Sequence, residues 1–478
     1  MEKNKFRNHI SVVLENGMRS IVVIFFAFVG NFLRGSEDSG DMGDGVLYIG
    51  LALLGILIVL LVWQILIWAK TYISVQGNTL VVERNTLNKK KNTIGLKNVS
   101  NVNLEQNLFE MLLGTCKVKL DTNTLTTADQ TDVKIVLKKK DTEEFKKMIL
   151  GKMDEEEIQV KEESQKKYMA EMEDIIVHGV FSLSLVSVMI LVGVIAGVIN
   201  TISDLSLESI QGNVTETILT ILVAVWVLGG LAWKVVKGFV QYVDFTVERR
   251  EDKIYMNYGL LKKVAYSVPV DKINGVQLIQ TGIARLGKRY TVEVINVGMG
   301  DDDNESQSFF LPYAKKEQIE ARIQMLLPEF ADCMKIQEQK QDKSIWTIWI
   351  PGMIGYLLVM AAIWGVVVEL MPEMFLAASL GVGIGTLIVL LIRIAGYLTK
   401  GIAVHENALK IINGSFARRI LFVKYEKIQY ITAKQNWIAK KYKLQKGSIH
   451  LLAASKNTIH DLPYFTEEKM EELKRRII

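Results

Sequence analysis

The sequence predicts a membrane protein of mixed α and β structure. Six transmembrane helices form three hairpins, and each hairpin is followed by a cytoplasmic β-sheet or β-barrel module with a C-terminal helix. Three observations predict this fold: long apolar segments recur along the chain, one block of sequence occurs three times, and each block follows a pair of apolar segments. Of the 478 residues 49% are hydrophobic, which favours a membrane protein over a soluble enzyme of several domains.

Six apolar segments approach the roughly 20 residues that are needed to cross a bilayer. They are Ser20–Leu33, Val46–Ala69, Ile175–Ile202, Thr217–Trp233, Ile345–Val368 and Met374–Ile392. The first is the weakest, because Arg19 and Arg34 bracket it closely, and we expect either that those side chains snorkel or that the helix includes Val12–Leu14 upstream. Within each pair, the connector is rich in acids and, apart from Arg34, lacks Lys and Arg. The positive-inside rule therefore predicts a multi-pass cell-membrane protein with both termini and all soluble segments in the cytoplasm.

The repeated block has one aliphatic residue seven positions before a glutamine and another four positions before it. The glutamines are Gln106, Gln280 and Gln435, the first aliphatic residues are Val99, Ile273 and Ile428, and the second are Val102, Val276 and Ile431. A repeat of this kind indicates three copies of one structural unit. We expect the aliphatic residues to form the core of each copy.

Each copy reads as several strands followed by one amphipathic helix. After the first strand, Asn85, Gly259 and Gly414 occupy equivalent positions, which predicts a hairpin turn with left-handed backbone. The closing helices are predicted at Lys140–Leu150, Leu311–Leu327 and Leu462–Ile478, and the last two begin with Leu-Pro-Tyr.

These elements give eight predicted regions. The transmembrane hairpins are 1–70, 175–240 and 345–399, the modules are 71–150, 241–328 and 400–478, and the linkers are 151–174 and 329–344. The first linker, dense in Glu and Lys, is predicted to be a solvated helix, and a disordered tether is the alternative.

The hairpin-plus-module unit, the aliphatic line before the glutamine and the closing helix resemble the bacterial pleckstrin-homology-like (DUF304-type) membrane proteins. More narrowly, they resemble the three-module YdbT-like members. The resemblance covers about residues 12 to 478, and the segment QNLFEMLLGTCKVKLDTNT carries it most closely. The third copy departs from the pattern, with Lys441 where Leu112 and Leu286 stand and with no glycine nearby.

The resemblance implies pleckstrin-homology (PH)-like modules and a role in cell-envelope stress or in resistance and immunity to antimicrobial peptides such as bacteriocins. It also implies a protein partner, with a single-module relative of the same family as a candidate. An interaction or scaffold protein fits three modules held close together at one membrane. The alternative is a component of a lipid or peptide transporter, which the near absence of ionisable residues within the apolar segments disfavours.

A basic tip follows the predicted turn in each copy and is the candidate ligand-binding site. The tips comprise Lys89, Lys90, Lys91, Lys262, Lys263, Arg418 and Arg419. Basic side chains near an anionic inner leaflet gain roughly 1 kcal/mol each, so membrane lipids are the expected ligand. The competing interpretation is ordinary solvated lysines of a turn.

No catalytic motif is found, so we expect no enzyme activity, no cofactor, no metal and no nucleic-acid partner. The five histidines do not lie at metal-ligand spacing, and the acidic run Asp301–Glu305 lacks the ligand pattern of a calcium loop. The two cysteines, Cys116 and Cys333, are expected to be free reduced thiols.

Overall fold

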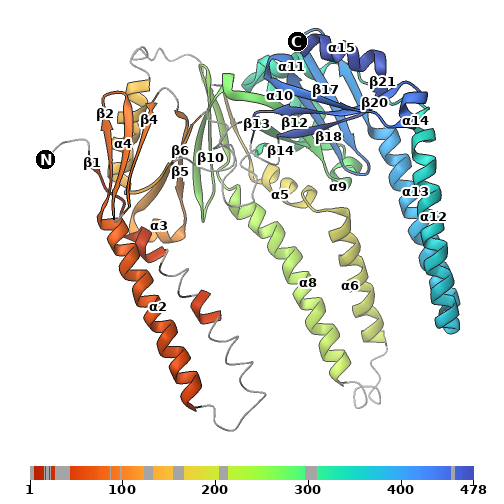
Figure 1. The fold of residues 1–478 in the computed structure, drawn as a ribbon, viewed down its shortest axis with the longest axis horizontal. Coiled ribbons are helices and arrows are strands. Elements are labelled where there is room, and N and C mark those ends of the chain that lie inside the picture. The colour runs from red at the N-terminus through yellow and green to blue at the C-terminus, as the bar shows by residue number, and fades with distance from the viewer. Residues whose placement is uncertain are drawn as a thin grey trace. The chain divides into compact units, whose positions relative to one another are not determined.

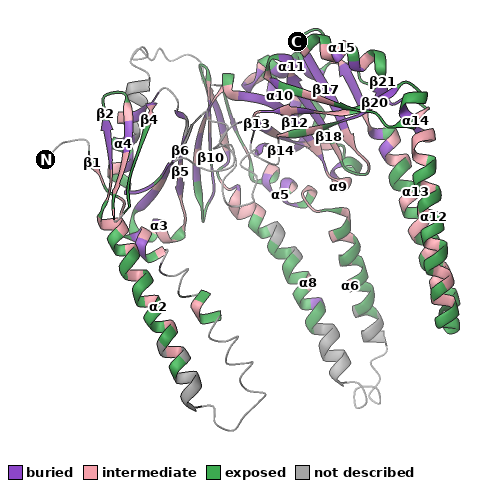
Figure 2. Cartoon of the chain, viewed as in Figure 1, coloured by how far each residue is buried: buried purple, intermediate pink, exposed green. Residues whose placement is uncertain are grey.

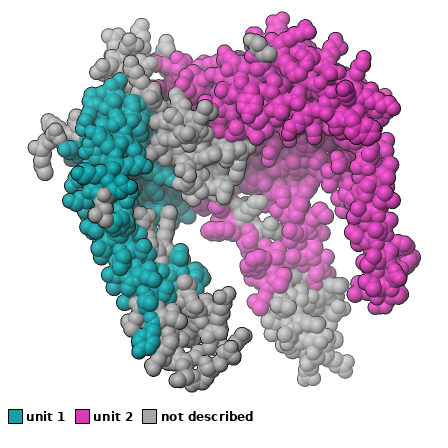
Figure 3. Space-filling view, viewed as in Figure 1, with its two compact units in different colours: residues 1–123, 131–163, 261–267 teal, residues 124–130, 164–260, 268–478 magenta. Residues whose placement is uncertain are grey.

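The computed structural model of the chain describes residues 5–15, 17, 21, 23–26, 43–86, 88–96, 99–122, 133–153, 166–203, 214–296, 309–453 and 458–477 (Figure 1). These residues form two compact units (Figure 3). Unit 1 holds the described residues of 1–123, 131–163 and 261–267, and unit 2 holds those of 164–260 and 268–478.

Unit 1 is built from two antiparallel sheets around one core. The first sheet has the order β1-β2-β3-β4, with β1 at Lys5–Phe6, β2 at Thr71–Gln76, β3 at Thr79–Asn85 and β4 at Lys89–Gly95. The second contains β5 (Val99–Gln106), β6 (Thr115–Thr122) and β7 (Val133–Lys138), with the short helix α3 (Leu108–Leu113) between β5 and β6. Helix α4 (Lys139–Met153) closes the core with Phe145 and Ile149, which are fully buried.

The second repeat contributes one strand to unit 1. Strand β11 (Lys263–Pro269) pairs antiparallel with β5, and the register places Lys263 opposite Gln106 and Ala265 opposite Leu104. A strand from one repeat therefore extends the sheet of the repeat before it.

Unit 2 begins with the rest of the second repeat. Strands β8 (Lys166–Met169), β9 (Thr246–Arg250) and β10 (Lys253–Tyr258) are antiparallel neighbours, and helices α5 (Met172–Phe181), α6 (Leu185–Ser203) and α8 (Val214–Gln241) lie between β8 and β9 in the chain. The repeat continues with the 3-10 turn η3 (Val270–Lys272), β12 (Ile273–Gln280), α9 (Gly282–Leu286), β13 (Arg289–Asn296), β14 (Phe309–Lys315), α10 (Lys316–Leu326) and α11 (Pro328–Met334).

The third repeat completes unit 2. Its first part comprises β15 (Gln339–Lys340), α12 (Ile345–Leu370), the 3-10 turn η4 (Pro372–Met374), α13 (Phe375–Thr399), β16 (Gly401–Val404), β17 (Ala408–Gly414) and β18 (Arg418–Lys424). Its second part comprises the 3-10 turn η5 (Tyr425–Lys427), β19 (Ile428–Lys434), α14 (Trp437–Lys441), β20 (Leu444–Leu451), β21 (Ile459–Thr466) and α15 (Glu467–Ile477).

Strand sharing recurs in unit 2. A seven-stranded sheet has the order β14-β13-β12-β18-β17-β16-β15, so β12 of the second repeat pairs with β18 of the third. This joint places Gln280 opposite Arg418 and Val276 opposite Phe422. Strands β19, β20 and β21 form a separate three-stranded sheet, which packs on the third core together with α15. The described sheets are open, and the closed-barrel form of the predicted module is not found.

Each repeat has a strand that precedes its helices. Strands β1, β8 and β15 pair with β2, β9 and β16, which follow the helices in the chain. The prediction of a helix across 151–174 is therefore wrong at Lys166–Met169, which forms β8, and part of the second linker forms α11 and β15. Segments β8 and β15 are strands because the edges of β9 and β16 supply hydrogen-bond partners for their backbone groups.

Closing helices are present in all three repeats, but two of them begin later than predicted. The Leu-Pro-Tyr segments lie in β14 and β21, and the helices begin at Lys316 and Glu467. Both strands are at the edge of their sheets, where a proline without an N–H does not interrupt a ladder.

Three helical segments in the described residues are long and apolar enough to cross a membrane: Ala52–Ala69 in α2, α12, and Pro372–Thr399, which contains α13. None of these spans is buried inside the protein (Figure 2). Helices α5 and α6 meet the same criterion as a pair bent by 78°, which would make a fourth span. Helix α8 is not among them, and most of the predicted first span, Ser20–Leu33, lies outside the described residues. Six spans in three hairpins remain a prediction.

Candidate functional site

The repeated glutamine closes a turn in every copy. The Nε2 amides of Gln106, Gln280 and Gln435 donate to the main-chain carbonyls of Thr115, Arg289 and Leu444, at 2.7, 3.1 and 3.0 Å. Each acceptor lies nine residues further on, beyond a short helix. The residue after each glutamine caps that helix through its side chain, and these residues are Asn107, Thr281 and Asn436. The glutamine therefore has a structural role and does not mark a ligand site.

The aliphatic line before the glutamine is in the core, as predicted. Val99, Ile273 and Ile428 are all buried. Val102 and Val276 are also buried, whereas Ile431 is only partly so, because its strand β19 lies at a sheet edge. Neither Cys116 nor Cys333 is in a disulfide, as expected, and both are buried.

The turn before each basic tip contacts the chain that leaves the preceding helix. The Asn85 amide donates to the Lys70 carbonyl at 2.9 Å, just after α2, and the Gly259 amide donates to the Val243 carbonyl at 2.8 Å, just after α8. In the third copy, the Thr399 hydroxyl donates to the Ser415 carbonyl at 3.1 Å, at the end of α13. All three tips therefore lie beside the end of an apolar helix.

Backbone conformation at these turns follows the prediction at two positions of three. Gly259 and Gly414 have φ of 108° and 124°, in the region that favours glycine. A Cβ at Gly414 would come within 2.0 Å of the Ala417 carbonyl oxygen. Asn85 is instead the last residue of β3 and pairs with Lys89.

The seven predicted ligand-binding residues have three different environments. Lys89, Lys90 and Lys91 are exposed on β4, and Lys91 forms an ion pair with Glu83 at 3.1 Å. Lys263 and Arg418 begin the strands that form the joints between repeats.

Their neighbours differ as well. The Lys262 ammonium is 3.5 Å from a carboxylate oxygen of Glu105, and the Arg418 guanidinium donates to Glu338 at 3.1 Å. Only Arg419 lines a cavity. The structure does not gather the seven residues into one site.

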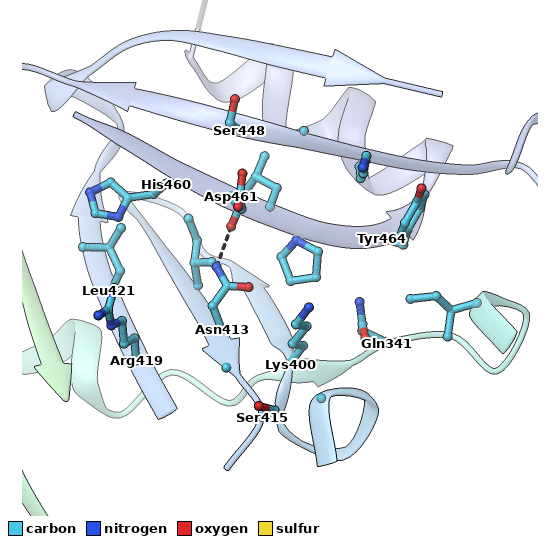
Figure 4. A pocket seen from close by; sticks show the side chains of 18 of the residues that line it. Gln341, Lys400, Asn413, Ser415, Arg419, Leu421, Ser448, His460, Asp461 and Tyr464 are labelled. Atoms are coloured by element: carbon cyan, nitrogen blue, oxygen red, sulfur yellow. Dashed lines mark hydrogen bonds between the residues drawn. The ribbon is translucent and has the colours of Figure 1, made fainter. Parts of the chain in front are cut away.

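A cavity of about 980 Å³ lies in unit 2 between the strands of the third repeat and the ends of α12 and α13 that are nearest to them. It is lined by residues of strands β12, β17, β18, β19, β20 and β21 and of the two helices. Figure 4 shows Gln341 and Lys400 side by side on one wall and Arg419 and His460 on the opposite wall. The Asn413 side chain, in the floor between them, donates to the main-chain carbonyl of Asp461 at 2.6 Å.

The cavity is basic in one part and apolar in the other. Five Lys and Arg side chains line it against one carboxylate, Asp461; they are Arg393, Lys400, Arg419, Lys434 and Lys446. Burial lowers the pKa of Lys400 below its usual value, and the positive charges of Arg393 and Lys446 lower it further, while Asp461 opposes them. The field inside the cavity therefore favours an anion.

Sequence reasoning did not find this cavity. Gln341, Lys400, Lys446 and Asp461 stand far apart in the sequence, and only the fold of the third repeat brings them together. The one signal was Arg419, as part of the third basic tip. Within the described residues, no group of three or more His, Cys, Asp or Glu side chains is placed to hold a metal.

The fold and these surfaces define a class of protein: apolar helices that carry a series of small two-sheet modules, each closed by a helix. The bacterial PH domain family matches this chain three times, at residues 24–153, 180–328 and 349–478. These matches cover most of the sequence, and the chain belongs to the bacterial PH domain family as a protein with three copies. Searches of curated proteins and of solved structures found no match.

Proposed function

We propose that this protein is a multi-pass membrane scaffold whose three cytoplasmic PH modules recruit a further PH module from another chain. The observation that carries the proposal is strand sharing between repeats. In both joints, the first strand of a module's second sheet pairs with the fourth strand of the next repeat. The register is the same in both, because the repeated glutamine lies opposite the basic residue that begins the partner strand: Gln106 with Lys263, and Gln280 with Arg418.

The two strands that would continue this series are at sheet edges. Among the described strands, β4 ends the sheet β1-β2-β3-β4 and β19 ends the sheet β19-β20-β21. Strand β4 exposes Lys89 to Thr93, and β19 exposes Gln429, Tyr430, Ala433 and Lys434. The equivalent strand β12, which is paired on both sides, is buried along most of its length. An exposed strand edge offers unpaired backbone groups to an added strand.

The chemistry of β19 favours a PH module as its partner. It has no acidic residue, and it presents Tyr430, Ile431 and Thr432, which are residue types that pair well across strands. The joint between β12 and β18 supplies the geometry: a strand that begins with a basic residue opposite the glutamine and continues with apolar residues. A single-module relative of the family is the partner that the proposal favours.

A photo-crosslinker tests the edge. We expect p-benzoylphenylalanine in place of Tyr430, which is 55% exposed on β19, to crosslink to a polypeptide that contains a PH module. Tyr442 is the matched control, because it is 41% exposed in the same repeat but lies outside β19. Mass spectrometry of the adducts identifies the partner. Equal adducts from both positions, or adducts only with proteins that lack a PH module, would contradict the proposal.

The membrane topology that we propose has six spans in three hairpins, with both termini in the cytoplasm. Pairing of β8 with β9 and of β15 with β16 supports it, because paired strands must lie on the same side of the membrane. The chain between them then crosses the membrane an even number of times.

Anionic inner-leaflet lipids are the proposed contacts of the basic tips. The position of the tips beside helix ends supports this proposal.

The biological role that we propose is in cell-envelope stress, as resistance or immunity to membrane-active antimicrobial peptides. A scaffold at the inner face of the membrane, held by several helices, is suited to that role. The test is deletion of the protein followed by challenge with a panel of bacteriocins and lantibiotics. We expect increased sensitivity to some of them, restored by the intact protein. Unchanged sensitivity across the panel would remove the role in defence without affecting the scaffold.

A further inference from the structure

The cavity between the strands of the third repeat and the nearest ends of α12 and α13 has the character of an amphiphile site. We propose that it binds one anionic phospholipid, with the phosphate held among Lys400, Arg419 and Lys446 and the acyl chains along the two helices. This goes beyond the proposed scaffold function, because it concerns a lipid held in a formed cavity and does not depend on any protein partner.

The basic side chains that line the cavity carry positive charge that the protein does not fully neutralise. Within the described residues, no carboxylate lies at ion-pair distance from Lys400, Arg419 or Lys434. The one acidic residue in the lining, Asp461, faces a larger number of cations. Cations brought together away from bulk water repel each other, and a bound phosphate relieves that repulsion. A bound anion therefore stabilises this group of cations.

The apolar part of the lining comes from the two helices. Ile345, Ile348 and Trp349 of α12 and Val389 and Ile392 of α13 line this part of the cavity. Both helices are long enough to cross a membrane, so a chain that follows these residues enters the apolar region of the bilayer.

Aromatic residues surround this end of the hairpin. The rings of Trp346 and Trp349 are 5.3 Å apart, and those of Trp346 and Tyr397 are 5.5 Å apart. Trp and Tyr gather at the level of the lipid head groups. The cavity is therefore placed at the depth of a phosphate group.

A buried hydrogen-bond acceptor without a partner indicates that the ligand also carries a donor. Gln341 is 5% exposed and lines the cavity beside Lys400, and its Oε1 atom accepts no hydrogen bond from the described residues. A buried acceptor that remains unpaired destabilises the protein. The hydroxyl of a glycerol head group is a donor that would satisfy it. Phosphate and hydroxyl together point to phosphatidylglycerol, and the volume of about 980 Å³ accommodates its head group.

The test uses the full-length protein in detergent and native mass spectrometry, with phosphatidylglycerol and phosphatidylcholine as probes. We expect retention of one phosphatidylglycerol and little phosphatidylcholine. The double variant Lys400→Gln/Arg419→Gln should bind phosphatidylglycerol roughly thirtyfold more weakly, since each of the two charges contributes on the order of 1 kcal/mol. The matched control is Lys440→Gln/Lys441→Gln, which removes the same charge from exposed positions of α14 in the same repeat, outside the cavity and the basic tips, and should bind as the wild type does.

Further measurements keep the outcome decisive. If the double variant does not fold, Gln341→Leu replaces it and should lower the preference for phosphatidylglycerol over phosphatidic acid, which lacks the glycerol head group. Equal retention of phosphatidylglycerol and phosphatidylcholine by the wild type, or an equal loss in the α14 control, would overturn the proposal. Displacement of the lipid by soluble glycerol 3-phosphate at similar concentration would also overturn it, because the ligand would then need no acyl chain.

Discussion

At the scale of single residues, the repeat conserves a turn more strictly than it conserves residue types. Gly114, Lys288 and Lys443 occupy the same position after the short helix, and their φ values are 63°, 50° and 51°. Lysine in this left-handed conformation carries a steric cost that glycine does not. The missing glycine of the third copy therefore does not change the turn, because the hydrogen bond of Gln435 and the cap of α14 hold it.

We expect Lys443→Gly to stabilise the protein. Relief of the left-handed strain raises the free energy of unfolding by about 1–2 kcal/mol. The greater conformational freedom of glycine in the unfolded chain lowers it by about 0.5–1 kcal/mol. The net gain of about 1 kcal/mol is measured by thermal unfolding in detergent. The reciprocal variant Gly114→Lys should have the opposite sign, and a stability loss from Lys443→Gly would contradict the assignment of strain to this turn.

At the scale of elements, the sequence predicted what repeats locally and missed what forms at a distance. The first strands, the turn glycines and the closing helices have patterns within a few residues. Strand β8 does not, because its sequence KKYM is short and charged, and only the edge of β9 makes it a strand. The joints between repeats were missed for a similar reason, because the sequence pattern of a strand does not show whether its second edge pairs with another strand.

The joint between β12 and β18 gives an element-scale prediction. A Cβ at Gly275 would lie 3.2 Å from the Phe422 carbonyl oxygen and 3.2 Å from a Val423 methyl group. We expect Gly275→Val to destabilise unit 2 by about 1–3 kcal/mol, because the neighbouring strand cannot withdraw without losing its ladder.

The equivalent position in the third repeat is the matched control. Tyr430 follows the same irregularity in strand register as Gly275, but it lies at the sheet edge and is 55% exposed. Tyr430→Val should therefore change stability by less than about 0.5 kcal/mol. Denaturant unfolding measures both variants, and equal losses would show that the joint is not the cause.

At the scale of the whole molecule, the family and the three-copy plan could be predicted, whereas the candidate site could not. The basic tips were visible as charge clusters, but the fold places two of them at joints between strands. The lipid cavity depends on the approach of helix ends to a sheet, and no single segment carries its signal. A site assembled from scattered residues becomes visible only when the backbone is folded.

Acid should destabilise unit 2. The hydrogen bond from Arg250 lowers the pKa of Glu248. Burial alone would raise the pKa of Glu329 and Glu338, but hydrogen bonds and charge from Arg249 and Lys410 more than offset it, so both values are lowered. A carboxylate with a depressed folded-state pKa contributes stability above its unfolded pKa, and this contribution is lost as the pH falls through the folded value.

We therefore expect the melting temperature to fall as the pH drops from about 5 to about 3. Glu329→Gln, which removes the carboxylate paired with Arg249 at 2.6 Å, should be less stable than the wild type at neutral pH and less sensitive to acid. Thermal unfolding across this pH series measures both effects. An identical pH dependence in wild type and variant would exclude Glu329 as a contributor.

The position of the helices within the repeat has a consequence for how the protein is made. Strand β15 leaves the ribosome before α12 and α13, and its partner β16 leaves after them. If α12 and α13 form the membrane hairpin that we propose, β15 can pair with β16 only after both helices have been inserted and the chain has returned to its original side. Helix insertion and sheet completion are thus coupled during biogenesis. A helix inserted in the wrong orientation would place β16 on the other side of the membrane from β15. The sheet can therefore be completed only when both helices have the correct orientation.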